Sequence, residues 1–290
     1  MRREIRSVTH SCLDRGVFVW RNALMLRLLL SLPAFLVWLL PAQGEPLEVD
    51  IELFLAVDVS RSMSPYELEI QRRGYAEALT SPRVIEAITG GMIGRIALTY
   101  VEWAGSHSQT VIIPWTLIDE KADAQAVAER LTAFFSDSMR RTSISEALIY
   151  AADSFEVNDF TGLRRVIDIS GDGPNNQGRP VLTAREEVLA RRITINGLPL
   201  MTVDEISLRW GIPDLDIYYT NCVIGGPGAF VVPVLEWDQF AEAVERKLVL
   251  EISNRLPQRR ARDSIVPVQG YDCLIGEKIW QRNQSDFFMP

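Results

Sequence analysis

Five side chains of this sequence have the types and the spacing to bind a hard metal ion. Three of them alternate in the segment DVSRS, which begins at Asp58 directly after the apolar stretch Val49–Val57. Alternate side chains of an extended loop point to the same face, so Asp58, Ser60 and Ser62 present three oxygen ligands together. We expect Asp58 to be exposed in the crevice at the end of this stretch rather than packed in the core.

Two further oxygen ligands follow later in the chain. Thr142 comes directly before a predicted helix that begins at Ser143, and Asp172 comes just after the apolar stretch Arg164–Ser170. Ligands of open α/β sheets bind outside the carboxyl ends of the strands, so we expect Thr142 and Asp172 to converge with the first loop. Two carboxylates and three hydroxyls suit Mg2+, Mn2+ or Ca2+, and the set contains no soft ligand.

This ligand set favours docking over catalysis. Neutral hydroxyls leave the charge of a divalent ion incompletely neutralised, so the ion favours an acidic group from outside in its remaining position. The sequence has no GxSxG motif, no cysteine–histidine pair in reach and no second carboxylate pair for a two-metal site. We expect a non-enzymatic module that binds a protein partner presenting an acidic residue. The alternatives are a metal-dependent hydrolase that uses the same carboxylates and a passive envelope protein with a degenerate site.

The elements that must position these residues alternate between strands and helices. Apolar, β-rich stretches predict strands at Val49–Val57, Arg95–Trp103, Gln109–Pro114, Arg164–Ser170, Thr194–Leu200 and Ala229–Val234. Helical spacing predicts helices after Ser64, at Asp119–Phe135, from Ser143 to Phe155, near Val181–Arg191 and at Trp237–Ile252. This order is typical of a doubly wound, mostly parallel α/β sheet with helices on both faces. A hairpin turn after Trp103 predicts one antiparallel edge strand.

Two of the predicted helices begin with a capping box. The segments Ser64-Pro65-Tyr66-Glu67 and Ser143-Ile144-Ser145-Glu146 both have a serine followed three residues later by glutamate. In this motif each side chain accepts a hydrogen bond from the other residue's backbone N–H.

The five oxygen-bearing residues, in this order, resemble the metal-ion-dependent adhesion site (MIDAS) of von Willebrand factor type A (vWA) domains. The resemblance spans roughly residues 50–253 and implies a Rossmann-like fold, a divalent cation (Mg2+ before Mn2+ or Ca2+) and an acidic protein partner. The pair Arg140-Arg141 departs from the family, in which glycine is common before the threonine. These cationic side chains could crowd the metal or help to hold an anionic partner. The segments YVEW, SGDGPNNQG and NCVIGGPGAFVVP further resemble exported bacterial vWA-like proteins of unknown function.

Residues 1–44 have the parts of a secretory signal peptide. The 13-residue apolar run Leu28–Leu40 follows Arg27 and precedes small residues, with cleavage expected after Gly44. A membrane-spanning helix needs ~20 apolar residues, more than this run contains. A start at Met25 gives a leader of ordinary proportions, so we expect Met25 to be the true start. An uncleaved N-terminal anchor is the alternative.

The leader predicts a periplasmic or extracellular protein with no stable membrane span after cleavage. We expect residues 45–253 to form the vWA-like domain and residues 254–290 a C-terminal tail, which by default is a solvated linker. Cys222 and Cys273 are the cysteines of the mature chain, and in an oxidising compartment they can form a disulfide. Two free buried thiols are the alternative. If the two cysteines pair, the tail is tied back onto the strand-end face of the domain.

Composition excludes a disordered chain, a collagen-like repeat and a polytopic membrane protein. The chain has 290 residues, of which 47% are hydrophobic and 23% charged, and a formal net charge of −8. These values are typical of a globular protein and give no basic footprint for a nucleic acid.

The sequence also predicts the surroundings of three further polar residues. Asp168 lies inside a predicted buried strand and should have a cationic partner, for which Arg164 and Arg165 are the candidates. Asn175 and Asn176 follow Asp172. A role in the loop turn is the first expectation for them, and contacts around the metal ligands or with the partner are the alternatives.

Overall fold

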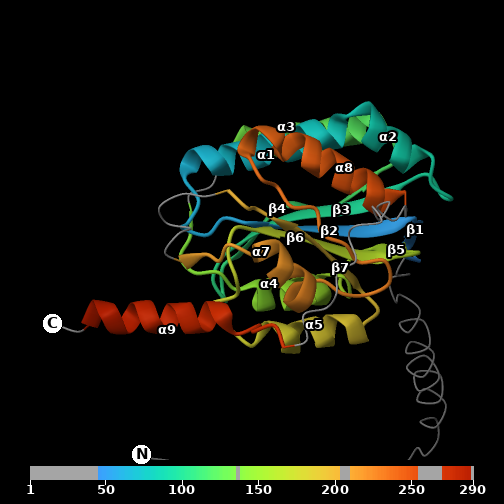
Figure 1. Ribbon diagram of the computed structural model, residues 1–290. Coiled ribbons are helices and arrows are strands. Elements are labelled where there is room, and N and C mark those ends of the chain that lie inside the picture. Colours follow the sequence, from blue (N-terminus) through green and yellow to red (C-terminus); the bar gives the residue numbers. More distant parts are fainter. Residues whose placement is uncertain (1–44, 135–137, 203–209, 254–269, 289–290) are drawn as a thin grey trace, which may run out of the picture. The chain divides into compact units, whose positions relative to one another are not determined.

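A five-stranded sheet forms the centre of the fold. Its mostly parallel order was predicted from the sequence, although six strands were expected. The computed structural model describes residues 45–134, 138–202, 210–253 and 270–288 (Figure 1). In spatial order the strands of the sheet are β4 (Gln109–Ile118), β3 (Ile96–Trp103), β2 (Ile51–Asp58), β6 (Arg165–Gly171) and β7 (Thr194–Pro199). Two short strands, β1 (Leu47–Val49) and β5 (Phe160–Gly162), pair with each other.

The direction of the strands brings the predicted ligand loops together. Strands β2, β3, β6 and β7 are mutually parallel, and β4 is antiparallel to β3 at one edge. The carboxyl ends of β2 and β6 are neighbours, because Val57 is paired with Ser170. The loops that begin after Asp58 and Gly171 therefore leave the sheet side by side.

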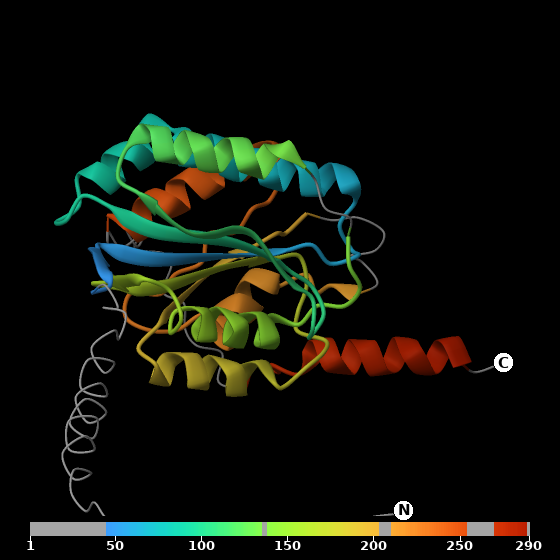
Figure 2. The ribbon, with the colours of Figure 1, turned by 180° about the vertical axis from the view of Figure 1, so that it is seen from behind.

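Helices cover both faces of the sheet (Figures 1 and 2). One layer consists of α1 (Pro65–Thr80), α2 (Pro82–Thr89), α3 (Lys121–Ala133) and α8 (Phe240–Ile252). The other contains α4 (Ile144–Ser154), α5 (Val181–Ala190) and the short α7 (Leu215–Tyr218). Along β2, Leu53 and Leu55 join the first core cluster, while Phe54 and Ala56 join the second. Burial on both faces explains why this strand is a nearly continuous apolar run.

The predicted strand at Ala229–Val234 does not form. Val231 and Val234 make only isolated bridges, to Gly197 and Leu200 respectively. Val232 and Val234 donate to the carbonyls of Gly197 and Pro199 in β7. Pro199 has no N–H to donate to the Val232 carbonyl between these two bonds, so the regular ladder is interrupted there.

One capping box is confirmed and the other is not. At α1, the Ser64 N–H donates to Glu67 and the Glu67 N–H donates to the Ser64 hydroxyl. At α4, the Ser143 hydroxyl instead donates to the backbone oxygen of Gln177, 2.9 Å away, and Glu146 pairs with Arg179. Contacts with the loop that follows Asp172 replace the local cap.

Among the described residues, no helix is both long enough and apolar enough to cross a membrane. The predicted leader and residues 254–269 of the tail lie outside the described residues.

Candidate functional site

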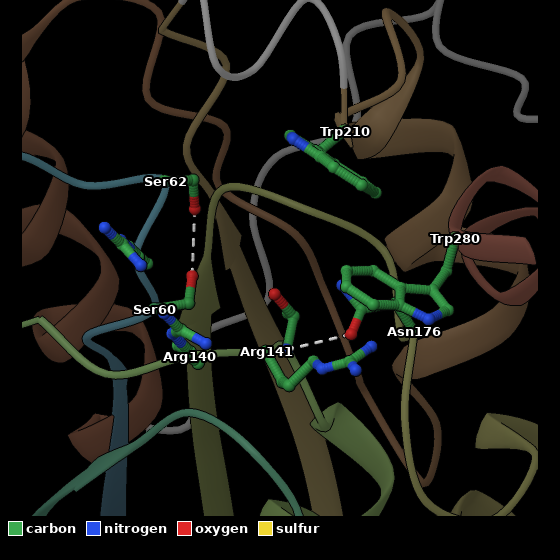
Figure 3. Close-up of a pocket in the computed structure, with 9 residues that line it drawn as sticks. Ser60, Ser62, Arg140, Arg141, Asn176, Trp210 and Trp280 are labelled. Atoms are coloured by element: carbon green, nitrogen blue, oxygen red, sulfur yellow. Dashed lines mark hydrogen bonds between the residues drawn. The ribbon is translucent and has the colours of Figure 1, made fainter. Parts of the chain in front are cut away.

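The loop after β2 is joined to the loop after β6 by hydrogen bonds among the predicted ligands. The Ser60 N–H donates to Asp58 Oδ1 at 2.7 Å, and the Ser60 and Ser62 hydroxyls lie 2.9 Å apart (Figure 3). The Ser62 hydroxyl then donates to Asp172 Oδ1, also at 2.9 Å. Four of the five predicted ligands therefore form one connected group.

Asp58 is fully buried, so the expectation that it is exposed in the crevice was wrong. Its Oδ2 atom has no hydrogen-bond partner among the described residues. Gly171, the last residue of β6, allows this close packing. A Cβ atom added at Gly171 would lie 2.9 Å from Asp58 Oδ2 and 2.8 Å from the hydroxyl of Tyr219. A strand end that packs against a neighbouring strand end cannot leave its side chain open to solvent.

The electrostatics of the pair Asp58 and Asp172 favour a cation. Burial raises the pKa of Asp58 well above its ordinary value, and the charge of Asp172 raises it further. Hydrogen bonds from Ser60 lower it in part. A buried carboxylate oxygen without a donor, beside a second carboxylate, fits a divalent ion, which would neutralise both groups.

Thr142 is held against the loop after β6 by a reciprocal pair of hydrogen bonds with Asn176. The Thr142 N–H donates to Asn176 Oδ1 at 3.0 Å, and the Asn176 N–H donates to the Thr142 carbonyl at 2.9 Å. Asn175 accepts a hydrogen bond from the backbone of Ser145 at 3.0 Å. Both asparagines therefore fix the position of the loop that contains Asp172.

A pocket of about 410 Å³ opens above this group (Figure 3). It is lined by Ser60, Arg61, Ser62, Arg140, Arg141, Thr142, Asn176, Trp210 and Trp280. Three of the five predicted ligands contribute to the lining, and Asp58 and Asp172 contact it through the two serines. The described residues contain no group of three or more His, Cys, Asp or Glu side chains that could hold a metal, so an ion here would need the hydroxyls.

A family model described as "Protein of unknown function (DUF1194)" matches residues 48–256. The chain belongs to this family. No curated protein matches it at a significant level.

Solved structures share the α/β fold of this DUF1194 chain. Proximal thread matrix protein 1 from the mussel byssus aligns with 13% identity and a TM-score of 0.53, over 72% of this chain and 49% of that one. The pilus adhesin SpaC from Lactobacillus rhamnosus GG aligns with 10% identity and a TM-score of 0.52, over 72% of this chain and 31% of that one. A von Willebrand factor type A structure from Catenulispora acidiphila gives 12% identity and a TM-score of 0.48, over 71% and 43%. The DUF1194 chain spans half or less of each of these chains, and the likeness concerns the fold alone.

The tail beyond the DUF1194 match reaches the site, as the sequence predicted for the case in which Cys222 and Cys273 pair. Helix α9 (Ile275–Phe288) follows Cys273, and a disulfide joins Cys273 to Cys222, as predicted. Glu277 of α9 accepts a hydrogen bond from the Asn175 side chain at 2.7 Å. The default reading of the whole tail as a solvated linker was therefore wrong. The pairing of the two cysteines was the signal that the tail returns to the domain.

Asp168 has a cationic partner, but it is neither of the predicted arginines. Its carboxylate forms an ion pair with Lys247 of α8. Arg164 instead donates to the backbone carbonyls of Glu251 and Ile252 at the end of that helix, and Arg165 pairs with Glu52. Arg165 is an odd number of positions from Asp168 and points to the opposite face of the strand. Arg164 is on the same face as Asp168 but about 13 Å along the strand, so it reaches the end of α8, while Lys247 of that helix lies over Asp168.

Proposed function

We propose that this protein is an exported, non-enzymatic binding module that engages an acidic protein partner through a divalent cation. The cation would be held by Asp58, Ser60, Ser62, Thr142 and Asp172. The observation that carries the proposal is the buried Asp58 oxygen, which lacks a hydrogen-bond donor in the described chain and lies below a pocket lined by hydroxyls.

Mg2+ is the first expectation for the ion, with Mn2+ and Ca2+ as alternatives. Magnesium keeps several waters and needs few protein carboxylates, and this site offers two. A serine hydroxyl can donate its proton to a carboxylate and still present oxygen lone pairs to a cation. The bond from Ser62 to Asp172 is therefore compatible with an ion on the hydroxyl oxygens.

Binding is favoured over hydrolysis by the groups that line the pocket. Its lining consists of hydroxyls, arginines, one asparagine and two tryptophans, and none of these is an ordinary general base at neutral pH. If the protein were instead a metal-dependent hydrolase, it would hydrolyse generic phosphoester or ester substrates in the presence of Mg2+. We expect no turnover above a Mg2+ blank.

Thermal unfolding with and without metal tests the cation site. An ion that binds only the folded state stabilises it by RT ln(1 + [M]/Kd), about 2.7 kcal/mol at a hundredfold excess over Kd. We expect Mg2+ or Mn2+ to raise the melting temperature and chelator to reverse the rise. A passive protein with a degenerate site predicts no shift with any of the three ions.

Capture from an envelope extract, with and without chelator, tests the partner. A protein recovered only when the divalent ion is present would support the proposal. Equal recovery under both conditions would contradict it, because the ion would then contribute nothing to docking.

A further inference from the structure

Three arginines surround the pocket, although the protein as a whole carries a net negative charge. Arg61 and Arg140 are exposed, and Arg141 is partly buried beside them. None of the three forms a salt bridge with another residue in the described parts of the chain. In the proposed site, Asp58 and Asp172 would offset the two charges of a divalent ion. The arginines would then remain as uncompensated positive charge at the mouth.

Arg141 has a strained backbone. Its φ angle is 77°, in the left-handed region that favours glycine. Among the described non-glycine residues only Arg192, with φ of 61°, shares this feature. Such strain persists where the surrounding structure holds it and is frequent at functional sites.

A stack of aromatic rings holds the Arg141 side chain over the pocket (Figure 3). Its guanidinium lies 3.3 Å from the centre of the Trp280 ring, and the Trp280 and Trp210 rings are stacked with centroids 5.0 Å apart. A guanidinium that stacks through its face keeps the N–H donors along its edge for a carboxylate.

The ring that holds Arg141 comes from the tail. Trp280 belongs to α9, which starts directly after the disulfide between Cys273 and Cys222. At Gly276 the helix packs so closely on the loop that contains Asp172 that an added Cβ would lie 2.1 Å from the Asn175 backbone oxygen. The disulfide and this contact therefore fix Trp280 beside the pocket.

We propose that Arg141, held by Trp280 and assisted by Arg140, forms a second anion subsite, so that the partner segment carries two neighbouring acidic side chains. One carboxylate would bind the cation and the other the guanidinium edge of Arg141. The inference rests on the proposed function, since it assumes a cation at the five oxygen ligands.

The test uses displayed short peptides with a fixed central aspartate and random neighbours, selected on the full mature chain in Mg2+ and eluted with chelator. We expect enrichment of Asp or Glu at a position next to the fixed aspartate. The best peptide is then synthesised with its second acid intact or replaced by the amide. For the wild type we expect the amide to raise Kd about tenfold or more, the usual scale for a charged hydrogen bond.

Arg141→Gly should remove this discrimination between the acid and the amide. It also relieves the backbone strain and removes a positive charge near the ion, so the variant should fold and bind Mg2+ at least as well as the wild type. Arg192→Gly relieves the same type of strain elsewhere and is the matched control, for which discrimination should be unchanged. Arg141→Lys keeps the charge but not the two-donor edge, and Trp280→Leu removes the stacked ring. Both variants should give intermediate discrimination.

Several outcomes would overturn the subsite. Enriched peptides without a second acid, or with an aromatic neighbour instead, would show that the arginines do not select the partner. Discrimination that survives in Arg141→Gly would assign it elsewhere. If Mg2+ stabilises the protein and no peptide is enriched, the subsite fails and the metal site stands. If Mg2+ does not stabilise the wild type, both the subsite and the proposed function fail.

Discussion

Ser62 donates a hydrogen bond to Asp172 across 110 positions of sequence, with 2.9 Å between the two oxygen atoms. This bond joins the loop after β2 to the loop after β6 at the floor of the pocket. The ligands are therefore gathered by the fold itself, before any ion is considered. An ion would add stability to an arrangement that already exists, and this is the basis of the first prediction.

Asp58→Ala and Asp58→Asn should both abolish stabilisation by Mg2+, a loss of about 2.7 kcal/mol at a hundredfold excess of ion over Kd. In chelator, Asp58→Asn should be at least as stable as the wild type, because it removes a buried charge that faces Asp172. Thermal melts of each protein with Mg2+ and with chelator measure both effects. Asp159→Asn, at an exposed position, is the control. An unchanged Mg2+ increment in either Asp58 variant would remove the metal assignment.

Gly171→Ala should lower the free energy of unfolding by about 1–3 kcal/mol, because its Cβ would enter the contact between Asp58 and Tyr219. It should also weaken Mg2+ binding by displacing the Asp58 carboxylate. Gly173→Ala, in the same loop, has no atom within 4 Å of its added Cβ and should do neither. Denaturant unfolding and Mg2+ titration compare the two variants. Equal behaviour of the pair would show that Gly171 is not required for close packing.

Glu251→Gln should flatten the dependence of stability on pH. Burial, and then the charge of Asp168, raise the pKa of Glu251 to about 7, although Lys247 opposes the rise. Because the folded-state pKa exceeds the unfolded one, its contribution is fully present below the unfolded pKa and is lost as pH rises through about 7. A shift of this size corresponds to at most about 3 kcal/mol.

The comparison needs unfolding free energies of wild type and Glu251→Gln from about pH 4 to pH 8, the window set by the two pKa values. The wild type should lose more stability over this window than the variant. Parallel curves would show that Glu251 does not bind a proton in the folded protein near neutrality.

Replacing both Cys222 and Cys273 with serine should destabilise the protein by up to about 4 kcal/mol, the chain-entropy value for a loop of this length. The cysteines are 51 positions apart in sequence. Loss of the disulfide should also release α9 and make its backbone amides exchange faster with solvent. Hydrogen exchange of the α9 amides, in the double variant and in the wild type, measures this release. Equal protection in the two proteins would show that the remaining contacts hold the helix without the disulfide.

Exported protein should begin at Glu45, and translation should begin at Met25. N-terminal sequencing of the exported form and mass measurement of the unprocessed form check the two statements. A mature chain that retains residues before Leu28 would contradict both.

Much of the fold and the candidate site could be predicted from the sequence because the signals are local. A strand buried on both faces is a continuous apolar run, and the residue that follows it must lie at the carboxyl edge of the sheet. This reasoning placed Ser62 and Asp172 together, and the structure joins them by a hydrogen bond. It also identified the antiparallel edge strand, from the short turn of its hairpin.

The tertiary structure alone decided how deeply those residues are buried and what surrounds them. Asp58 is covered because β6 ends in a glycine that packs against it, and no property of the Asp58 loop encodes that contact. Lys247 replaced Arg164 and Arg165 as the partner of Asp168, because α8, which is far away in sequence, packs on the face of the sheet where Asp168 lies. Trp280 reached the pocket for the same reason. Its helix has little periodic signal of its own, and a disulfide and one close glycine contact bring it to the site.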